Sequence, residues 1–162
     1  MDRRTVVAGL VMGGCGVMAA EAAEPQSINP VVAAFAQSLS AHDMDAFAAL
    51  FADDYVNHQT SAAAPPPAAG VSAKQGSVAF FAARLKGLPD LSVAIEASLA
   101  SEDMAAASFV YTGTHQGTYF GVAPTGKSLR FTSCDIFRIR NGKIAEHWGM
   151  GDIAGQLAQI KG

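Results

Sequence analysis

Charged residues are scarce in this sequence, and neither sign of charge dominates it. Asp, Glu, Lys and Arg make up only 15% of the 162 residues, whereas 50% are hydrophobic. Such a chain can bury enough apolar surface for a packed core, which excludes wholesale disorder. The formal net charge is -3, and the lack of a basic patch argues against nucleic acid as a partner. The length fits one domain.

Long hydrophobic runs and cysteine pairs are also missing. No apolar run reaches the roughly 18–20 residues that a transmembrane helix requires, so we expect no membrane span. The chain has 2 cysteines, Cys15 and Cys134. If Cys15 is removed with a leader, Cys134 has no partner for an internal disulfide. Its place in a predicted strand favours packing over a nucleophilic role.

The start of the chain is typical of an export signal. Arg3 and Arg4 precede a short apolar stretch, which ends at small residues in an A-x-A arrangement. This pattern indicates export and signal cleavage, and the arginine pair indicates the twin-arginine route. We therefore expect a periplasmic or extracellular protein. The alternatives are a lipoprotein anchored through Cys15 and a plain N-terminal helix.

These features predict three regions. Residues 1–23 form the export signal, residues 24–29 a linker, and residues 30–162 a single domain. Within the domain, apolar residues first recur at helical spacing in three segments, which begin at the capping residues Asn29, Asp43 and Ser72. A loop with three consecutive prolines, between residues 61 and 70, separates the second and third helices.

After Pro89 the apolar period changes to two. Four strands are predicted, at residues 91–99, 104–115, 128–140 and 143–151, followed by a short helix capped by Asp152. Helices that precede a run of antiparallel strands indicate an α+β fold, with the helices packed on one face of a curved sheet.

The Asn141-Gly142 turn sets the register of the last two strands. A two-residue turn pairs Ile139 with Ile144 and Asp135 with Trp148. Because cross-strand partners and residues two apart share a face, Asp135 lies on the apolar interior face. The same count places Phe131, Phe137, Trp148, Met150 and Glu146 on the interior face, and His147 on the outer face.

Asp135 is the main catalytic candidate. A carboxylate on an apolar face is costly unless it is paired or hydrogen-bonded, and a desolvated carboxyl group suits acid–base chemistry near neutral pH. The alternative is a structural carboxylate bonded to a backbone N–H or a tyrosine. A one-residue slip of register would move Asp135 to the outer face.

His115 is the second catalytic candidate, because it shares strand parity with Phe109 and Tyr111. The residues predicted to bind a substrate lie on the same interior face or at the mouth of the sheet: Asn57, His58, Tyr111, Phe131, Phe137, Trp148 and Met150. For Asn57 and His58 we expect one of the two to point inward. Each histidine also has a simpler interpretation as an ordinary loop residue.

No cofactor or metal motif is present. The four histidines lack H-x-x-H or H-x-x-x-H spacing, and no G-x-S-x-G elbow, P-loop or dinucleotide fingerprint occurs. We therefore expect neither a metal nor a cofactor.

Three segments together resemble a known family. Residues 53–58 (DDYVNH), 115–127 (HQGTYFGVAPTGK) and 135–148 (DIFRIRNGKIAEHW) are similar to the SnoaL-like polyketide cyclases and related ester cyclases. The resemblance covers about residues 30–155. The Ala- and Pro-rich insertion at residues 61–70 departs from the family pattern, and so does the export signal.

The resemblance implies the NTF2-like fold, a cone of three N-terminal helices and a strongly curved, mainly antiparallel sheet around a pocket. It also implies an acidic residue, at the position of Asp135, that acts as general acid/base in an aldol-type ring closure without metal or cofactor. A homodimer paired through the sheet is implied as well.

Two functions are compatible with these expectations. One is a cyclase or isomerase that acts on a small apolar, carbonyl-bearing molecule; the other is a non-catalytic protein that binds such a ligand. An Asp135 with a free oxygen that faces an open cavity favours catalysis. A fully hydrogen-bonded, enclosed Asp135 favours binding or a structural role.

Overall fold

The computed structural model describes residues 28–59 and 65–162. The predicted export signal, the Cys15 anchor and most of the linker lie outside these residues. The domain contains α1 (Pro30–Ser40), α2 (Met44–Ala49), β1 (Phe51–Asn57), α3 (Ala73–Gly87), β2 (Ser92–Ser101), β3 (Met104–Thr114), β4 (Ser128–Arg140), β5 (Lys143–Gly151) and α4 (Ile153–Lys161).

The helices begin at the predicted capping residues. The side chains of Asn29, Asp43, Ser72 and Asp152 each accept a hydrogen bond from a backbone N–H in the first turn of the helix that follows. Ser72 and Gln75 form a complete capping box. Local capping chemistry therefore defines where each of the four helices starts.

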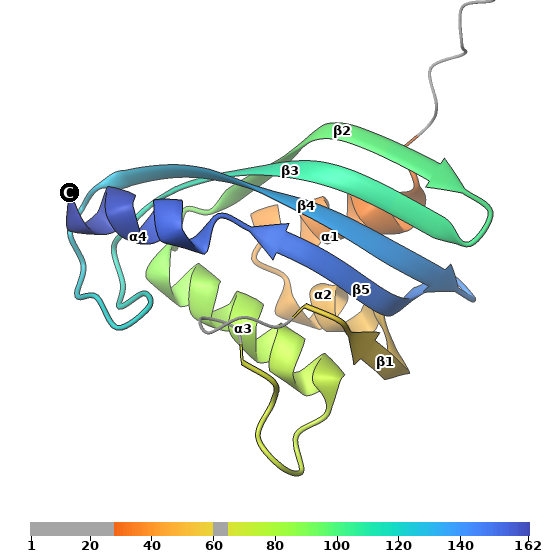
Figure 1. Cartoon of the computed structure of the whole chain (residues 1–162). Helices are drawn as coiled ribbons and strands as arrows, with labels where there is room; N and C mark the ends of the chain where they lie inside the picture. The colour runs from red at the N-terminus through yellow and green to blue at the C-terminus, as the bar shows by residue number, and fades with distance from the viewer. Residues whose placement is uncertain (1–27, 60–64) are drawn as a thin grey trace, which may run out of the picture.

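The strands form one five-stranded sheet in the order β1-β5-β4-β3-β2. All neighbouring pairs are antiparallel except β1 and β5, which run parallel. The sheet curls over α1, α2 and α3 on one side, and α4 lies beyond the end of β5 (Figure 1). This is the α+β architecture that the sequence predicts.

The core fills the space between the helices and the concave face of the sheet. Its centre is a cluster of aromatic rings in which Phe35 contacts Phe47, Phe81, Phe109 and Phe137 at centroid distances of 5.1–5.4 Å. Each of these rings is at least nine-tenths buried. Since alanine buries little area, these phenylalanines supply much of the hydrophobic driving force.

The register of the β4–β5 hairpin differs from the predicted one. Ile139 pairs with Ile144 as expected, but Arg138 then pairs with Glu146, so Ala145 is an extra residue on β5. This β-bulge moves every later side chain of β5 to the opposite face. Asp135 stays on the interior face, where 6% of it is exposed, and its partner is Gly149 rather than Trp148.

Three predicted interior positions are therefore wrong, and so is one predicted outer position. Trp148 pairs with Ile136, an exposed residue of β4, and Met150 is 77% exposed. Glu146 forms ion pairs on the outer side with His58 and Arg138. His147, expected on the outer face, is buried. The bulge causes all four differences.

No helix in residues 28–59 and 65–162 is both long and apolar enough to cross a membrane.

Candidate active site

A cavity of about 300 Å³ lies between α3, β5 and the loop residues Pro65, Pro66 and Pro67, called the proline loop below. Its apolar walls are Pro65, Pro66, Pro67, Ala73, Phe80 and Phe81, and its polar groups are Asn57, Gln59, Ser77 and His147. This size is at the lower end of the range for small-molecule sites, about 300–1,000 Å³. Apolar walls with a few polar groups on one side are typical of a binding site for a small organic ligand.

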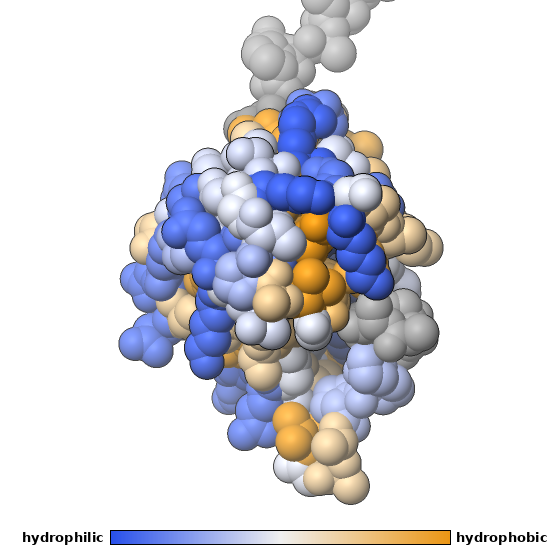
Figure 2. Space-filling view, turned by 90° about the vertical axis from the view of Figure 1, so that its left-hand side faces the viewer, coloured by the Kyte–Doolittle hydropathy of each residue, from blue (hydrophilic) through white to orange (hydrophobic). Residues whose placement is uncertain are grey.

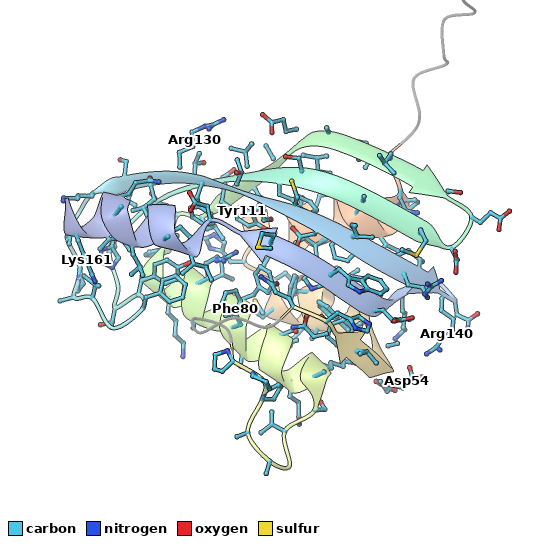
Figure 3. The ribbon with its side chains drawn as sticks, viewed as in Figure 1. Asp54, Phe80, Tyr111, Arg130, Arg140 and Lys161 are labelled. Carbon is cyan, nitrogen blue, oxygen red and sulfur yellow. The ribbon has the colours of Figure 1, made fainter. Side chains whose placement is uncertain are left out.

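The proline loop packs directly on α3 because Gly76 leaves room for it. A Cβ atom at Gly76 would lie 2.7 Å from Cγ of Pro67, closer than carbon atoms normally approach. On the same side of the cavity, Phe80 of α3 lies in the space between that helix and the sheet (Figure 3). The loop and the helix therefore form one side of the cavity, and β5 forms the other.

His147 and Asp135 form a buried pair at the wall of this cavity. Nε2 of His147 lies 2.7 Å from Oδ1 of Asp135, and the two side chains are 6% and 7% exposed. Oδ2 of Asp135 accepts a hydrogen bond from the Ser133 hydroxyl at 2.5 Å. Both carboxylate oxygens are therefore occupied, and His147, not Asp135, faces the cavity.

A chain of hydrogen bonds leads from the cavity to this pair. The amide nitrogen of Asn57 donates to Oγ of Ser77 at 3.4 Å, and the Ser77 hydroxyl donates to Oη of Tyr55 at 3.3 Å. Oη of Tyr55 lies 3.3 Å from Nδ1 of His147. Since the Ser77 proton already occupies one side of the Tyr55 oxygen, the phenol proton is free to point at Nδ1. His147 then carries its own proton on Nε2 and donates it to Asp135.

Burial keeps the tyrosine of this chain protonated. It raises the pKa of Tyr55 to about 12. The Ser77 hydrogen bond opposes this increase, and the negative charge of Asp135 adds to it. Tyr55 is therefore a hydrogen-bond donor at neutral pH. The direction of donation runs consistently from Asn57 toward Asp135, which is what a buried carboxylate requires.

Gly149 makes the Asp135–His147 contact possible. A Cβ atom at this position would lie 2.5 Å from Oδ1 of Asp135 and 2.6 Å from Nε2 of His147. Only glycine leaves space for both side chains, because Gly149 is the direct cross-strand partner of Asp135. The pairing of β4 with β5 thus positions both members of the pair.

Of the two residues predicted at the sheet mouth, Asn57 faces the cavity and His58 does not. His58 stacks on Trp148 at a centroid distance of 4.4 Å, and its Nε2 lies 2.7 Å from Oε2 of Glu146. This hydrogen bond is the largest cause of the lowered pKa of Glu146. His58, Trp148 and Met150 therefore lie outside the cavity, in contrast to the prediction.

His115 is fully buried but does not line the cavity. Its Nδ1 lies 3.0 Å from Oγ1 of Thr125 and 3.3 Å from the backbone nitrogen of Thr125. His115 thus holds together the two ends of the loop between β3 and β4. The structure gives no contact between His115 and the Asp135–His147 pair.

The remaining predicted ligand contacts belong to the core. Tyr111 and Phe131 stack on each other at 4.9 Å, and Phe137 stacks on the ring of His147 at 5.1 Å. All three are buried behind the cavity wall. Phe137 therefore supports the site by fixing the plane of the His147 ring, while Tyr111 and Phe131 have no place in the cavity lining.

Sequence reasoning missed Tyr55, Ser77 and Phe80. Ser77 and Phe80 lie on α3, three residues apart, and so share one helix face. In the sequence, the apolar spacing of Val78, Phe81 and Leu85 predicts which face of this helix is buried, but gives no signal for Ser77 and Phe80. Tyr55 had a usable signal, because its parity with Asn57 in an extended segment places both on one side.

No group of three or more His, Cys, Asp or Glu side chains that could hold a metal occurs in residues 28–59 and 65–162.

Residues 29–160 match the family model of the SnoaL-like polyketide cyclases. The match spans most of the chain, so this protein belongs to the SnoaL-like family, whose NTF2-like fold encloses a ligand pocket. The predicted family and fold are therefore confirmed. Among curated proteins, none matches the chain.

Solved structures show the same architecture. IdmH from Streptomyces antibioticus, a candidate polyketide cyclase, is 26% identical, with a TM-score of 0.69 and coverage of 82% of this chain and 96% of IdmH. AclR from Streptomyces galilaeus, a candidate hydroxylase, is 24% identical, with a TM-score of 0.68 and coverage of 81% and 78%. TsrD from Streptomyces laurentii is 21% identical, with a TM-score of 0.67 and coverage of 80% and 91%. The two assigned activities differ, which indicates that this fold alone does not define a reaction.

Proposed function

We propose that this protein binds a small apolar, carbonyl-bearing molecule and catalyses cofactor-free proton transfer on it, as in an aldol-type cyclisation or an isomerisation. The observation that carries the proposal is the buried Asp135–His147 pair at the wall of an apolar cavity. Membership in the SnoaL-like family supports the class of chemistry.

In this proposal His147 is the base and Asp135 positions it. A proton leaves a carbon next to the ligand's carbonyl group and reaches Nδ1 of His147, which gives up the hydrogen bond from the Tyr55 hydroxyl to accept it. The resulting enolate keeps the electron pair of the broken C–H bond. It attacks a second carbonyl carbon in a cyclisation, or takes a proton at another carbon in an isomerisation. The imidazolium formed on His147 is stabilised by the Asp135 carboxylate until it returns the proton.

Asn57, Gln59 and Ser77 are the other polar groups at the cavity wall, and Asn57 suits a different task. The Asn57 amide has a second N–H that can donate to a ligand oxygen, where negative charge develops as the enolate forms. Asn57 therefore takes the carbonyl-polarising role in this proposal, and His115, the second catalytic candidate of the sequence, takes no part. The apolar residues Phe80, Phe81 and Pro66 exclude water from the reacting atoms.

Deuterium exchange tests this proposal. The protein is incubated in D₂O with a small panel of bicyclic ketones, including 2-tetralone and 1-indanone, and deuterium at the carbon next to the carbonyl is measured by mass spectrometry. We expect exchange with the wild type and a loss of about 10²-fold or more in Asp135→Asn and His147→Gln. Asp45→Asn removes an exposed carboxylate on α2 and is the control that should keep full activity.

Binding is measured in parallel as an increase of melting temperature with each ketone. Asp135→Asn should retain this stabilisation, since the carboxylate does not face the cavity. The catalytic proposal would be contradicted if ketones stabilise the wild type but the wild type does not exchange deuterium into them.

That outcome would favour a second candidate, a non-catalytic binding protein. One observation supports it: Asp135 is enclosed, and both of its oxygens are hydrogen-bonded. The two candidates share the cavity and differ only in whether His147 exchanges a proton with the ligand.

We further propose that the protein is exported by the twin-arginine route. Arg3, Arg4 and the small residues at 20–22 carry this proposal. Fractionation of cells that express the full chain should show a shortened protein in the periplasm. Replacement of both arginines by lysine should leave the uncleaved protein in the cytoplasm, and an identical distribution of the two forms would refute the route.

A further inference from the structure

Arg84 is a buried cation without a carboxylate partner among residues 28–59 and 65–162. It lies on the face of α3 that points toward the sheet, and only 5% of it is exposed. Its guanidinium carbon lies 5.0–5.2 Å from the ring centroids of Phe80, Phe81, Tyr111 and Phe131. These cation–π contacts offset part of the cost of burying the charge, but they provide no hydrogen-bond acceptor in the guanidinium plane.

The hydrogen bonds of Arg84 are largely unused. Nε donates to Oη of Tyr119 at 3.1 Å, and the two terminal nitrogens have no acceptor within the described parts of the chain. A guanidinium group carries five N–H donors. Four of them therefore have no acceptor in the described parts of the chain. The terminal nitrogens are not among the fully buried atoms without a partner, so they reach accessible space in which an acceptor can bind them.

Gln156 adds a second unused donor next to the same tyrosine. Oη of Tyr119 donates to Oε1 of Gln156 at 2.7 Å. Gln156 is fully buried, and its Nε2 has no hydrogen-bond partner. The amide donor of Gln156 and the guanidinium of Arg84 thus flank one hydroxyl group, and neither has an anion to bind.

His115 supplies a third donor near the ring of Tyr119. Because the backbone N–H of Thr125 points at Nδ1 of His115, Nδ1 must be the unprotonated nitrogen and Nε2 carries the proton. Nε2 is buried and unpartnered, and the His115 ring lies 6.4 Å from the Tyr119 ring. The unpartnered groups of Arg84, Gln156 and His115 are all hydrogen-bond donors, so the surroundings of Tyr119 lack hydrogen-bond acceptors.

This donor cluster lies directly behind the cavity of the proposed active site. Phe80 and Phe81 line the cavity with one part of their surface and contact the Arg84 guanidinium with another. Phe81 is buried in the core, whereas Phe80 is only half-buried. Phe80, the less buried of the two rings, is therefore the side chain that must rotate for a ligand in the cavity to reach the guanidinium.

We infer that Arg84 is an anchor for a carboxylate carried by the ligand, with the Gln156 amide as a second donor. The inference rests on the proposed function and narrows its substrate class to an apolar keto acid whose carboxylate lies at the inner end of the cavity. A carboxylate fits better than a single-point acceptor, because the two terminal nitrogens of Arg84 match its two oxygens. The carbonyl end of the molecule then lies toward His147.

Paired ligands test the inference. The dissociation constants of 2-naphthoate and of its neutral analogue 2-naphthamide are measured by isothermal titration calorimetry. We expect the wild type to bind the carboxylate about 10-fold more tightly or better, since hydrogen bonds to a charged group are worth at least this much. Arg84→Met should abolish the preference while binding the amide as before. Lys86→Met removes an exposed cation of the same helix and should leave the preference unchanged.

The outcomes separate this inference from the proposed function. Equal affinity of the wild type for both compounds would overturn the role of Arg84 and leave the cavity as a site for neutral ligands. A preference that survives in Arg84→Met would overturn it as well. Failure of both compounds to bind would overturn the inference together with the ligand-binding proposal. The wild-type comparison decides the matter even if Arg84→Met fails to fold.

Discussion

At the scale of single residues, the candidate active site is built from common side chains, and only their arrangement is unusual. A histidine, an aspartate and a tyrosine become a proton-transfer system because all three are buried and hydrogen-bonded in one direction. The aspartate was predictable, since strand parity alone places Asp135 on the apolar face. The inward position of His147 was not predictable, because a β-bulge reverses its strand parity and the residues of the turn give no signal for that bulge.

The three tyrosines, Tyr55, Tyr111 and Tyr119, should all resist ionisation in the folded protein. Burial raises the pKa of each, that of Tyr55 to about 12 from 10.0 in the unfolded chain. The unfolded chain therefore loses phenol protons first, and stability that is complete below pH 10 is lost as the pH rises toward 12. Tyr55 alone contributes about 2–3 kcal/mol of this loss.

Absorbance at 295 nm as a function of pH checks this prediction. No phenolate signal should develop near pH 10 while the circular dichroism is still native. The same protein in concentrated urea is the control, with tyrosines that titrate near the normal value. Ionisation near pH 10 of a chain that is still folded would contradict the burial of these hydroxyl groups.

At the scale of secondary-structure elements, the sequence predicted most of the fold. Caps and proline located the helices, and the period of two located β4 and β5 to the residue, because these signals are local. The pairing of β1 with β5 was not predictable, since parallel pairing across about 90 residues depends on tertiary packing. The bulge at Ala145 also depends on tertiary packing. Ile144 and Ala145 are both buried, because packing against the core favours an inward position for both side chains.

Gly149 of β5 provides a test of the β4–β5 pair. Ala in place of Gly in a strand normally gains a little stability, but here the new Cβ would collide with Asp135 and His147. We expect Gly149→Ala to lower the free energy of unfolding by about 1–3 kcal/mol, because a buried pair is broken, and to abolish proton exchange. Urea denaturation measures the change.

Gly151 is the matched control on the same strand. A Cβ atom there would meet only Cβ of Ser133, at 3.9 Å, which is an ordinary contact. Gly151→Ala should stay within about 0.5 kcal/mol of the wild type. If the two variants have equal stability, the space at Gly149 is not what holds the Asp135–His147 pair in place.

At the scale of the whole molecule, polar and apolar residues are divided between different surfaces. The end that carries α4 shows mostly hydrophilic residues around a small apolar patch (Figure 2). The side of the sheet away from the helices is different. Two of its arginines are paired within the chain, Arg138 with Asp103 and Glu146, and Arg140 with Asp54. Leu99, Ile136 and Met150 are exposed at 63%, 44% and 77%.

We propose that this sheet face joins two copies of the chain. Acidic residues of the same chain neutralise Arg138 and Arg140, which lowers the electrostatic repulsion between the sheet faces of two copies. Ile136→Asp should convert a dimer into a monomer, as measured by light scattering during size-exclusion chromatography. Val56→Asp is the control, since Val56 is exposed to a similar extent, 45%, but lies on β1. A monomeric wild type, or a dimer that tolerates Ile136→Asp, would exclude this interface.

The extra residue at Ala145 has a consequence for comparisons among distant relatives. Two chains of this family that differ by one residue in this hairpin present opposite sets of side chains to their pockets, although the letters around the turn look alike. A gap-free alignment of the segment would then match a histidine inside one protein with a histidine on the surface of another. Transfer of a catalytic assignment across such an alignment therefore needs the strand pairing, in addition to the sequence.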